Sequence, residues 1–496
     1  MADYNRNFFH HWVPQWLQNI LVIIGFLPLM MVNGVYIKNL SFMVSETQLL
    51  SSYFMMAYFA SSIGMYIVYP LGLRLKQAFH SKKLVIGSLL SLALLSHICS
   101  STNNATLFIL CSLLIGVAKF IGLFEFLIPL IQLLCTNTSR EKSYPILYPL
   151  LMLISYFGSF FYTKIAEIFH WNDVYHIMVI ILLVETLIMI LVMHHKRSMR
   201  RFPFYQIDWI GMILFTTILM GINYILCMGE YHDWFKGPII KELAICILTL
   251  LSIFIYHESK LKRPYLDLNH IKQRNVIASI ILSLAVGFFL ASGSVLSIYI
   301  KSILGYDNNS YAVFYVSMLP GCIIGGLICY HWFRHKWNLK ILIMIGVGCS
   351  MSSNIIFYFL FSPVGDISNM ILPMIIKGVG TIILFVTIGI YCYQDLPPEN
   401  KFSAGAIFTT IRSFVGVALF ITLFNWGFKY LQLQHLSSLA SNIDCILWTT
   451  RSKSSIYRSI GIQSILLAAK QIYGYTIIIG CSILILISFF RFDKKV

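Results

Sequence analysis

Long apolar segments alternate with short polar ones along this chain of 496 residues. Each apolar segment approaches or exceeds the ~20 residues that a helix needs to cross a hydrocarbon core about 30 Å thick. The segments lack the strict alternation of apolar and polar residues that is typical of strands in a membrane barrel, so helices are predicted. The predicted spans are 16–37, 48–72, 83–101, 105–131, 144–168, 174–194, 207–228, 238–257, 275–301, 311–333, 339–361, 369–394, 402–428 and 472–490.

The composition fits fourteen membrane-spanning helices and leaves no room for a separate soluble domain. Hydrophobic residues make up 58% of the chain and charged residues only 11%, and the mean hydropathy is +0.78. No polar segment reaches the roughly 50 residues at the lower end of domain size. The eleven cysteines show neither a CxxC pair nor a metal-ligand spacing, so packing residues and no metal are expected. The predicted fold class is an all-α membrane protein.

The net charge of +17 is distributed as an orientation signal, which argues against a nucleic-acid partner. Every second polar segment is basic, and these segments contain Arg74, Lys76, Lys82, Lys83, Arg140, Lys142, Lys196, Arg197, Arg200, Arg201, Lys260, Lys262, Arg263, Lys272, Arg274, Arg334, Lys336, Lys340, Arg491, Lys494 and Lys495. Cytoplasmic segments are enriched in Lys and Arg, so both termini are predicted to lie in the cytoplasm of a multi-pass protein of the cell (inner) membrane. The segment 429–471 is predicted to lie outside, and its Arg451, Lys453 and Arg458 are the exception to the pattern.

Two predicted hairpins resemble each other and suggest an internal repeat. Tyr69-Pro70 ends the second span before a basic loop, and Leu319-Pro320 lies in the tenth span before another basic loop. Transporters are commonly built from two six-helix halves with the substrate site between them. Aligning the hairpins predicts an N-terminal half at 1–200, an inserted helix pair at 201–262, and a C-terminal half at 263–496 with the outer segment at about 429–471.

The inserted pair carries the most specific resemblance to a known family. Residues 208–211 (Asp-Trp-Ile-Gly) and the acidic-aromatic segment 229–234 resemble the 14-helix drug/proton antiporter branch of the major facilitator superfamily. Residues 263–268 and 396–399, followed by Arg412, resemble the same branch. The resemblance runs nearly end to end, and it implies a bundle of two six-helix halves plus an inserted pair that transports substrates in exchange for protons.

Departures from the branch indicate a divergent member. The branch carries an Asp in span 1 shortly before a Val-Asn pair, whereas this chain has Pro28 before Val32-Asn33. Its span-4 Arg is absent, and Ser112 stands nearby. The antiporter signature Gly-Pro-x-x-Gly-Gly of span 5 is replaced by the sequence at 158–163. The usual groups for proton coupling are therefore missing.

Five charged residues are predicted deep in the membrane, where each costs at least about 2.5 kcal/mol unless it faces a cavity or a partner. They are Lys119, Glu125, Glu185, Lys377 and Arg412. Desolvation penalises the charged form of a carboxyl group, so a deep carboxyl is suited to carry a proton. Glu125 is the first proton-coupling candidate, with Lys119 and Glu185 beside it. Lys377 and Arg412 are the expected charge partners from the other half.

Each of these assignments has a plainer structural alternative. Lys119 and Glu125 project about 120° apart around one helix, so each needs a partner on another helix, and such a pair can be purely structural. Lys and Arg side chains can also extend to the membrane interface. Asn33, Phe124, Tyr156 and Tyr162 are candidates for the substrate cavity, although packing against lipid explains most aromatic residues of a membrane protein.

The predicted function is secondary-active, proton-coupled export of amphipathic small molecules or drugs by alternating access. The expected partners are the substrate, protons, the lipid bilayer and, in a Gram-negative cell, an adaptor protein with its outer-membrane channel. One alternative is uptake or export of a specific metabolite without proton antiport. A membrane-embedded lipid-modifying enzyme is disfavoured, because the polar segments lack the acidic and histidine clusters that such chemistry needs. No catalytic residue, cofactor or ATPase motif is predicted.

Overall fold

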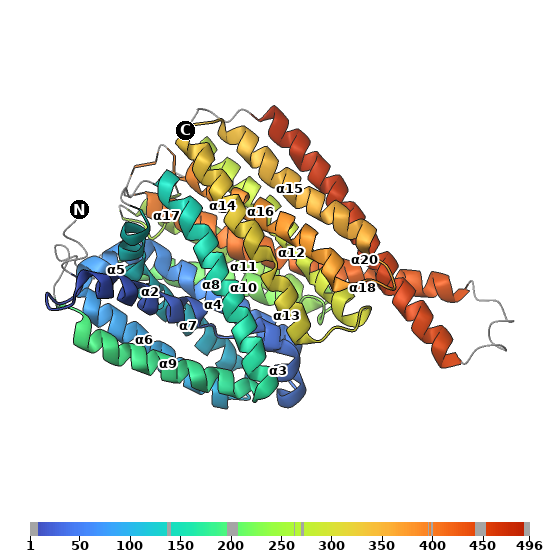
Figure 1. Ribbon diagram of the computed structural model, residues 1–496, viewed down its shortest axis with the longest axis horizontal. Helices are drawn as coiled ribbons and strands as arrows, with labels where there is room; N and C mark the ends of the chain where they lie inside the picture. Colours follow the sequence, from blue (N-terminus) through green and yellow to red (C-terminus); the bar gives the residue numbers. More distant parts are fainter. Residues whose placement is uncertain are drawn as a thin grey trace. The chain divides into compact units, whose positions relative to one another are not determined.

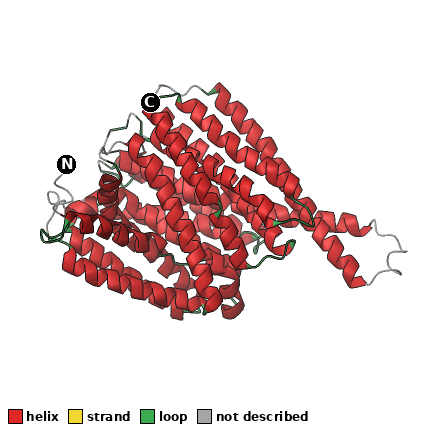
Figure 2. Ribbon diagram, viewed as in Figure 1, coloured by secondary structure: helices red, strands yellow, loops and turns green. Residues whose placement is uncertain are grey.

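The computed structural model describes residues 8–135, 140–195, 207–261, 263–268, 272–394, 396–397, 400–441 and 453–490. These residues form helices, with one isolated antiparallel bridge between Phe9 and Met193 (Figures 1 and 2). The all-α fold class is therefore confirmed.

The helices follow the predicted spans closely. Their bounds are α2 Gln15–Met31, η1 Ile37–Asn39, α3 Leu40–Thr47, α4 Ser51–Val68, η2 Tyr69–Leu71, α5 Gly72–Ala78, α6 Ser81–Ser101, α7 Ala105–Leu134, α8 Arg140–Ile168, α9 Trp171–Val192, α10 Trp209–Met228, η4 Trp234–Lys236, α11 Pro238–Lys260, α12 Arg274–Ser302, α13 Asn308–Val316, α14 Met318–Arg334, α15 Leu339–Leu360, η6 Ile367–Met370, α16 Ile371–Cys392, α17 Lys401–Thr410, the π-helical η7 Ile411–Val415, α18 Gly416–Ser441 and α20 Lys453–Phe489. Within the described part of the chain, thirteen helical segments are long and apolar enough to cross a membrane. Each corresponds to one predicted span.

The first predicted span is shorter than the sequence indicates. Helix α2 ends at Met31 after 17 residues, although the apolar pattern extends to residue 37. Pro28 lies inside the last turn, and the chain beyond Met31 is extended before it turns through η1 and α3. A proline inside a helix lacks a backbone N–H, so Pro28 removes the hydrogen bond to the carbonyl of Ile24 in the turn before it. The result is an apolar helix end within the segment where a full span was expected.

The segment 429–471, expected to be an outer loop, is helical over most of its length. Helix α18 continues to Ser441 and α20 begins at Lys453. The two helices run side by side (Figure 1), and His435 and Gln471 bond to each other at 2.8 Å. Polar residues ended the apolar pattern there but did not end the helices, because the segment 429–441 contains neither Gly nor Pro. Residues 442–452, including Arg451, lie outside the described residues.

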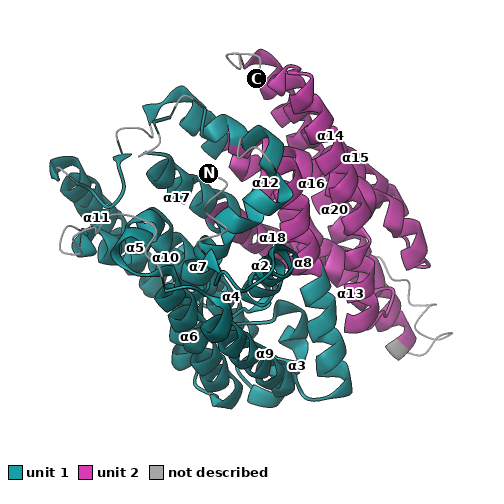
Figure 3. Ribbon diagram, turned by 60° about the vertical axis from the view of Figure 1, so that its left-hand side comes forward, with its two compact units in different colours: residues 1–143, 157–280, 390–414 teal, residues 144–156, 281–389, 415–496 magenta. Residues whose placement is uncertain are grey.

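Two compact units make up the chain (Figure 3). Unit 1 comprises residues 1–143, 157–280 and 390–414, and unit 2 comprises 144–156, 281–389 and 415–496. The helix pair α10–α11, which the sequence sets apart, lies in unit 1. Asn223 of α10 donates to the Met56 carbonyl of α4 at 2.8 Å, and Tyr265 donates to the Ile67 carbonyl at 2.6 Å. The division into two halves and an inserted pair stays a prediction.

Glycines allow helices to pack closely inside each unit. In unit 1, a Cβ added at Gly116 of α7 would collide with the Ser61 carbonyl oxygen of α4. In unit 2, a Cβ at Gly321 of α14 would collide with the Ile375 carbonyl oxygen of α16. Small residues at membrane helix contacts let backbones approach without a side chain between them. These contacts hold α7 and α16, the helices that carry the deep charges Lys119, Glu125 and Lys377.

The first described residues are tied to the end of α9. The His10 N–H donates to the Val192 carbonyl at 3.0 Å, and the His194 N–H donates to the Phe8 carbonyl at 3.1 Å. Phe8 and Phe9 are buried, and the Phe8 ring meets Phe126 of α7 edge to face with centroids 5.7 Å apart. We call Phe8–His10 together with Val192–His194 the terminal clasp.

Candidate functional site

The ammonium group of Lys119 caps the C-terminal end of α2. Its ammonium nitrogen donates to the Met30 carbonyl at 2.9 Å, to the Val32 carbonyl at 2.7 Å and to Asn33 Oδ1 at 3.0 Å. The last carbonyls of a helix have no intrahelical donor, and a cation there also complements the helix dipole. An ammonium group has three N–H donors, so these three acceptors satisfy it. The sequence predicted a partner on another helix for Lys119, and the structure confirms one.

Three tyrosines lie around the same end of α2. The Tyr162 hydroxyl donates to the Met31 carbonyl at 2.7 Å, and the Tyr175 hydroxyl donates to the Gly34 carbonyl at 2.7 Å. The Tyr36 ring lies against Tyr162 with centroids 4.3 Å apart. Two candidates for the substrate cavity, Asn33 and Tyr162, thus lie close to the end of α2 at Met31.

Glu125 forms a fully buried ion pair with Lys76. The Lys76 Nζ and Glu125 Oε2 atoms are 3.3 Å apart, and the two side chains are 0% and 1% exposed. The Phe124 ring, another cavity candidate, lies 5.9 Å from the same ammonium group. The sequence placed Lys76 in a cytoplasmic loop, but the helix continues through η2 and α5 to Ala78. The stretch from Gly72 to Ala78 contains no proline, which is the signal that could have revealed this partner.

The predicted partner Arg412 has a different environment. It lies in the π-helical turn η7, with its guanidinium carbon 5.0 Å from the centre of the Phe408 ring. Its side chain is 9% exposed and belongs to unit 1. The ion pair that the structure shows at Glu125 is with Lys76. A cross-half role for Arg412 stays a prediction.

Glu185 of α9 is a buried carboxyl group in an apolar pocket. It is 2% exposed, and neither carboxylate oxygen has a hydrogen-bond partner among the residues that the structure describes. The pocket has a volume of about 210 Å³ and is lined by Ile24, Pro28, Ile180, Ile181, Val184, Glu185 and Ile188. Pro28 stands where the resembling branch carries an acidic residue, so a carboxyl group from α9 now lies beside that position. A lone buried carboxyl is stable mainly in its neutral, protonated form.

Unit 2 contains the remaining two candidates. Lys377 of α16 is 4% exposed and donates to the Ser292 hydroxyl of α12 at 2.9 Å. The Tyr156 hydroxyl donates to the Met318 sulfur at 3.2 Å, and its ring lies 5.2 Å from that of Tyr315. The two candidates therefore belong to the same unit, and Tyr156 is half-buried.

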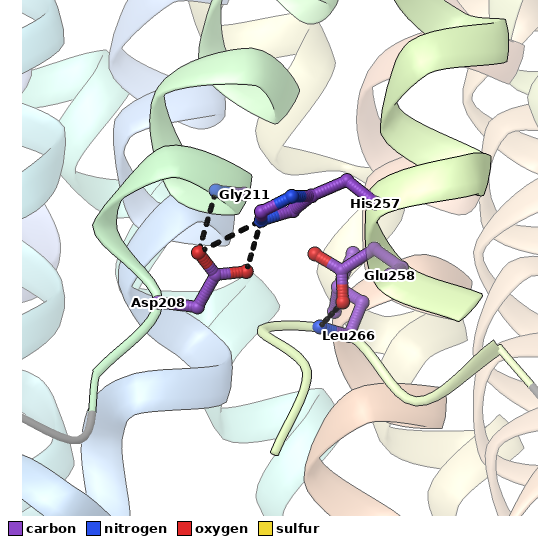
Figure 4. A network of polar contacts seen from close by, with 5 residues as sticks. All are labelled: Asp208, Gly211, His257, Glu258 and Leu266. Atoms are coloured by element: carbon purple, nitrogen blue, oxygen red, sulfur yellow. Dashed lines mark hydrogen bonds and ion pairs between the residues drawn. The ribbon is translucent and has the colours of Figure 1, made fainter. Parts of the chain in front are cut away.

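A polar network at the ends of α10 and α11 was not predicted as a site (Figure 4). Asp208 accepts from the Gly211 N–H at 3.0 Å, which caps α10, and lies 3.1 Å from His257 Nε2. Glu258 accepts from the Leu266 N–H at 3.1 Å. The sequence marked the motif at 208–211 only as a family resemblance. In the structure, Asp208 of this motif connects the start of α10 to His257 near the end of α11. Across the described residues, no group of three or more His, Cys, Asp and Glu side chains could hold a metal ion.

Apolar spanning helices with buried ionisable groups are typical of membrane proteins that move ions or substrates, and comparison with known proteins identifies the family. The chain belongs to the Major Facilitator Superfamily, whose family model matches residues 19–420. The family and the structural neighbours are those of transporters, not of enzymes.

Two relatives are drug or fatty-acid resistance proteins. The chain is 20% identical over 283 residues to the colistin resistance protein EmrB of Acinetobacter baumannii, covering 54% of this chain and 53% of the relative. It is 26% identical over 214 residues to the fatty acid resistance protein FarB of Neisseria gonorrhoeae, covering 42% and 41%. The chain thus spans about half the length of these relatives.

Solved transporter structures share the fold at low sequence identity. A mutant of the peptide transporter POT in complex with sulfate has a TM-score of 0.59 and 12% identity, covering 98% of this chain and 97% of that chain. A mutant of the nucleoside transporter NupG has a TM-score of 0.58 and 12% identity, covering 94% and 98%. These similarities concern the fold alone.

Proposed function

We propose that the protein is a secondary-active exporter that moves amphipathic small molecules out of the cell in exchange for protons. The names of the two relatives, which refer to resistance to colistin and to fatty acids, support export of amphipathic compounds. The observation that carries proton coupling is the buried pair of Glu125 and Lys76, whose side chains are 1% and 0% exposed. Protonation of such a carboxylate removes its attraction to the ammonium group, so a proton can open the pair.

Glu185 is the second proton-coupling candidate. Its carboxyl group has no ionic partner among the described residues, so binding or losing a proton changes the local charge directly. Lys119 has a supporting role, because its three acceptors hold the end of α2 next to the pocket that contains Glu185. Phe124 and Tyr156 are half-buried and remain candidates to contact substrate, whereas Asn33 and Tyr162 shape the backbone nearby.

In everted membrane vesicles that contain the protein, adding a transported amphiphile should release protons from an acidified lumen. A protonophore should abolish both this movement and substrate accumulation, because the substrate gradient is driven by the proton gradient. The measurement is fluorescence of a pH-sensitive dye inside the vesicles, with vesicles lacking the protein as the control. Substrate movement that persists unchanged with no ion gradient, and that stops at equal concentrations, would instead indicate facilitated movement of a metabolite.

We also propose that both termini face the cytoplasm, which the alternation of basic segments supports. Alkaline phosphatase fused after His80 should be inactive and fused after Asn103 should be active, since this reporter folds only outside the cytoplasm. These two positions flank α6, so a single helix separates the two results. The reverse pattern would contradict the proposed orientation of the helices, which is based on the alternation of basic segments.

A further inference from the structure

Lys377 is a buried cation for which the described part of the chain provides no acidic partner. It is 4% exposed in α16, and the four ion pairs among the described residues do not include it. Its contact is the Ser292 hydroxyl at 2.9 Å. An ammonium group has three donors, and a neutral oxygen satisfies one donor without balancing the charge. A charge buried in this way is costly unless an opposite charge is supplied.

Ser292 is fixed so that its hydroxyl oxygen accepts from Lys377. The hydroxyl donates its own hydrogen to the Phe289 carbonyl at 2.8 Å, and this directs its lone pairs away from that carbonyl. The Ser292 carbonyl in turn accepts from the Tyr473 hydroxyl of α20 at 3.0 Å. Asn354 of α15 lies 3.4 Å from the serine oxygen. The position of the ammonium group is therefore set by contacts from several helices of one unit.

Gly293 leaves space beside this ammonium group. A Cβ added there would lie 3.9 Å from Lys377 Nζ and 3.6 Å from the Tyr315 hydroxyl, which are ordinary contact distances. A larger side chain at Gly293 would extend into the region between these two polar groups. Two further aromatic rings lie next to the Tyr315 ring. The ring centroids of Tyr156 and Tyr311 are 5.2 and 5.7 Å from the centroid of Tyr315. A cation, a hydroxyl group and aromatic faces therefore meet within unit 2.

We propose that Lys377 binds the carboxylate of an amphipathic acid, with Tyr156 and Tyr315 in contact with its apolar body. A carboxylate would accept the ammonium hydrogens that Ser292 leaves, and charge-assisted hydrogen bonds of this kind are about twice as strong as neutral ones. Aromatic rings suit the apolar part of such a ligand. This inference rests on the proposed export function and narrows its substrates to lipophilic acids.

The test compares two probes with the same alkyl chain and opposite charge, dodecanoate and dodecyltrimethylammonium, binding to the purified full-length protein. Lys377→Met should weaken dodecanoate binding by about tenfold or more, the size of a lost charge-assisted hydrogen bond. Lys377→Arg keeps the charge and should stay within about threefold of the wild type. Binding of dodecyltrimethylammonium should change little in either variant.

A second variant pair keeps the lysine and fills the space. Gly293→Leu should reduce dodecanoate binding by about tenfold through steric exclusion, whereas Gly293→Ala should bind nearly normally because its Cβ fits. Unchanged dodecanoate binding in both Lys377→Met and Gly293→Leu would overturn the proposal, and so would equal losses for the two probes. Because binding is measured without transport, a protein that binds the acid but moves nothing in vesicles would refute export alone.

Discussion

Replacing Glu125 by Gln is expected to abolish proton-coupled transport and to destabilise the protein by about 3–5 kcal/mol, the usual result of leaving one buried charge without its partner. The structural reason is that the Lys76 ammonium group, which lies 3.3 Å from the Glu125 carboxylate and is 0% exposed, would lose this carboxylate partner. Thermal unfolding of the purified variant and substrate-driven proton movement in everted vesicles are the two measurements. Lys76→Met should be destabilised in the same way.

The double variant separates structure from coupling. Lys76→Met with Glu125→Gln removes both charges, so most of the lost stability should return, as it often does when a buried pair is replaced by neutral residues. Proton coupling should stay absent because the proposed proton-coupling carboxyl group is gone. If the double variant still couples transport to protons, Glu125 is structural, and Glu185→Gln becomes the variant that should lose coupling.

Replacing Lys119 by Met should disrupt the end of α2. Three hydrogen bonds disappear, to Met30, Val32 and Asn33, and each buried acceptor left without a donor costs roughly 1–3 kcal/mol. Loss of transport and a lower unfolding temperature are expected, with faster amide exchange at residues 30–36. Asn33→Ala removes one acceptor and keeps the lysine, so about 1 kcal/mol is expected. Equal effects of the two variants would argue against Lys119 as the group that holds this helix end.

Most of the helical fold could be predicted from the apolar pattern, because a bilayer imposes one length and one secondary structure on every span. Two departures stand out. Helix α2 ends at Met31 although the apolar pattern continues, and the polar but Gly- and Pro-free segment after residue 428 extends α18. Hydropathy measures where helices enter lipid, and it does not measure where helices end.

The candidate site could be predicted only as a set of residues. The deep positions of Lys119, Glu125, Glu185 and Lys377 follow from the sequence, and each is buried in the structure. Their partners depend on tertiary packing and were missed. Lys76 was one of many cations assigned to loops, and Ser292 was not singled out in the sequence. The carboxyl of Glu185 lies beside Pro28 although 156 residues separate them, which no local pattern reveals.

The terminal clasp has a consequence for how the protein is made. The backbone at Phe8 and His10 pairs with residues 192–194, which follow some 180 residues later in the chain. At synthesis rates of about 5–20 residues per second, Phe8 and His10 wait roughly 10–40 s before their partners leave the ribosome. During that interval Phe8 and His10 lack the backbone partners that they have in the folded protein. The clasp can close only after α9 has been synthesised in full.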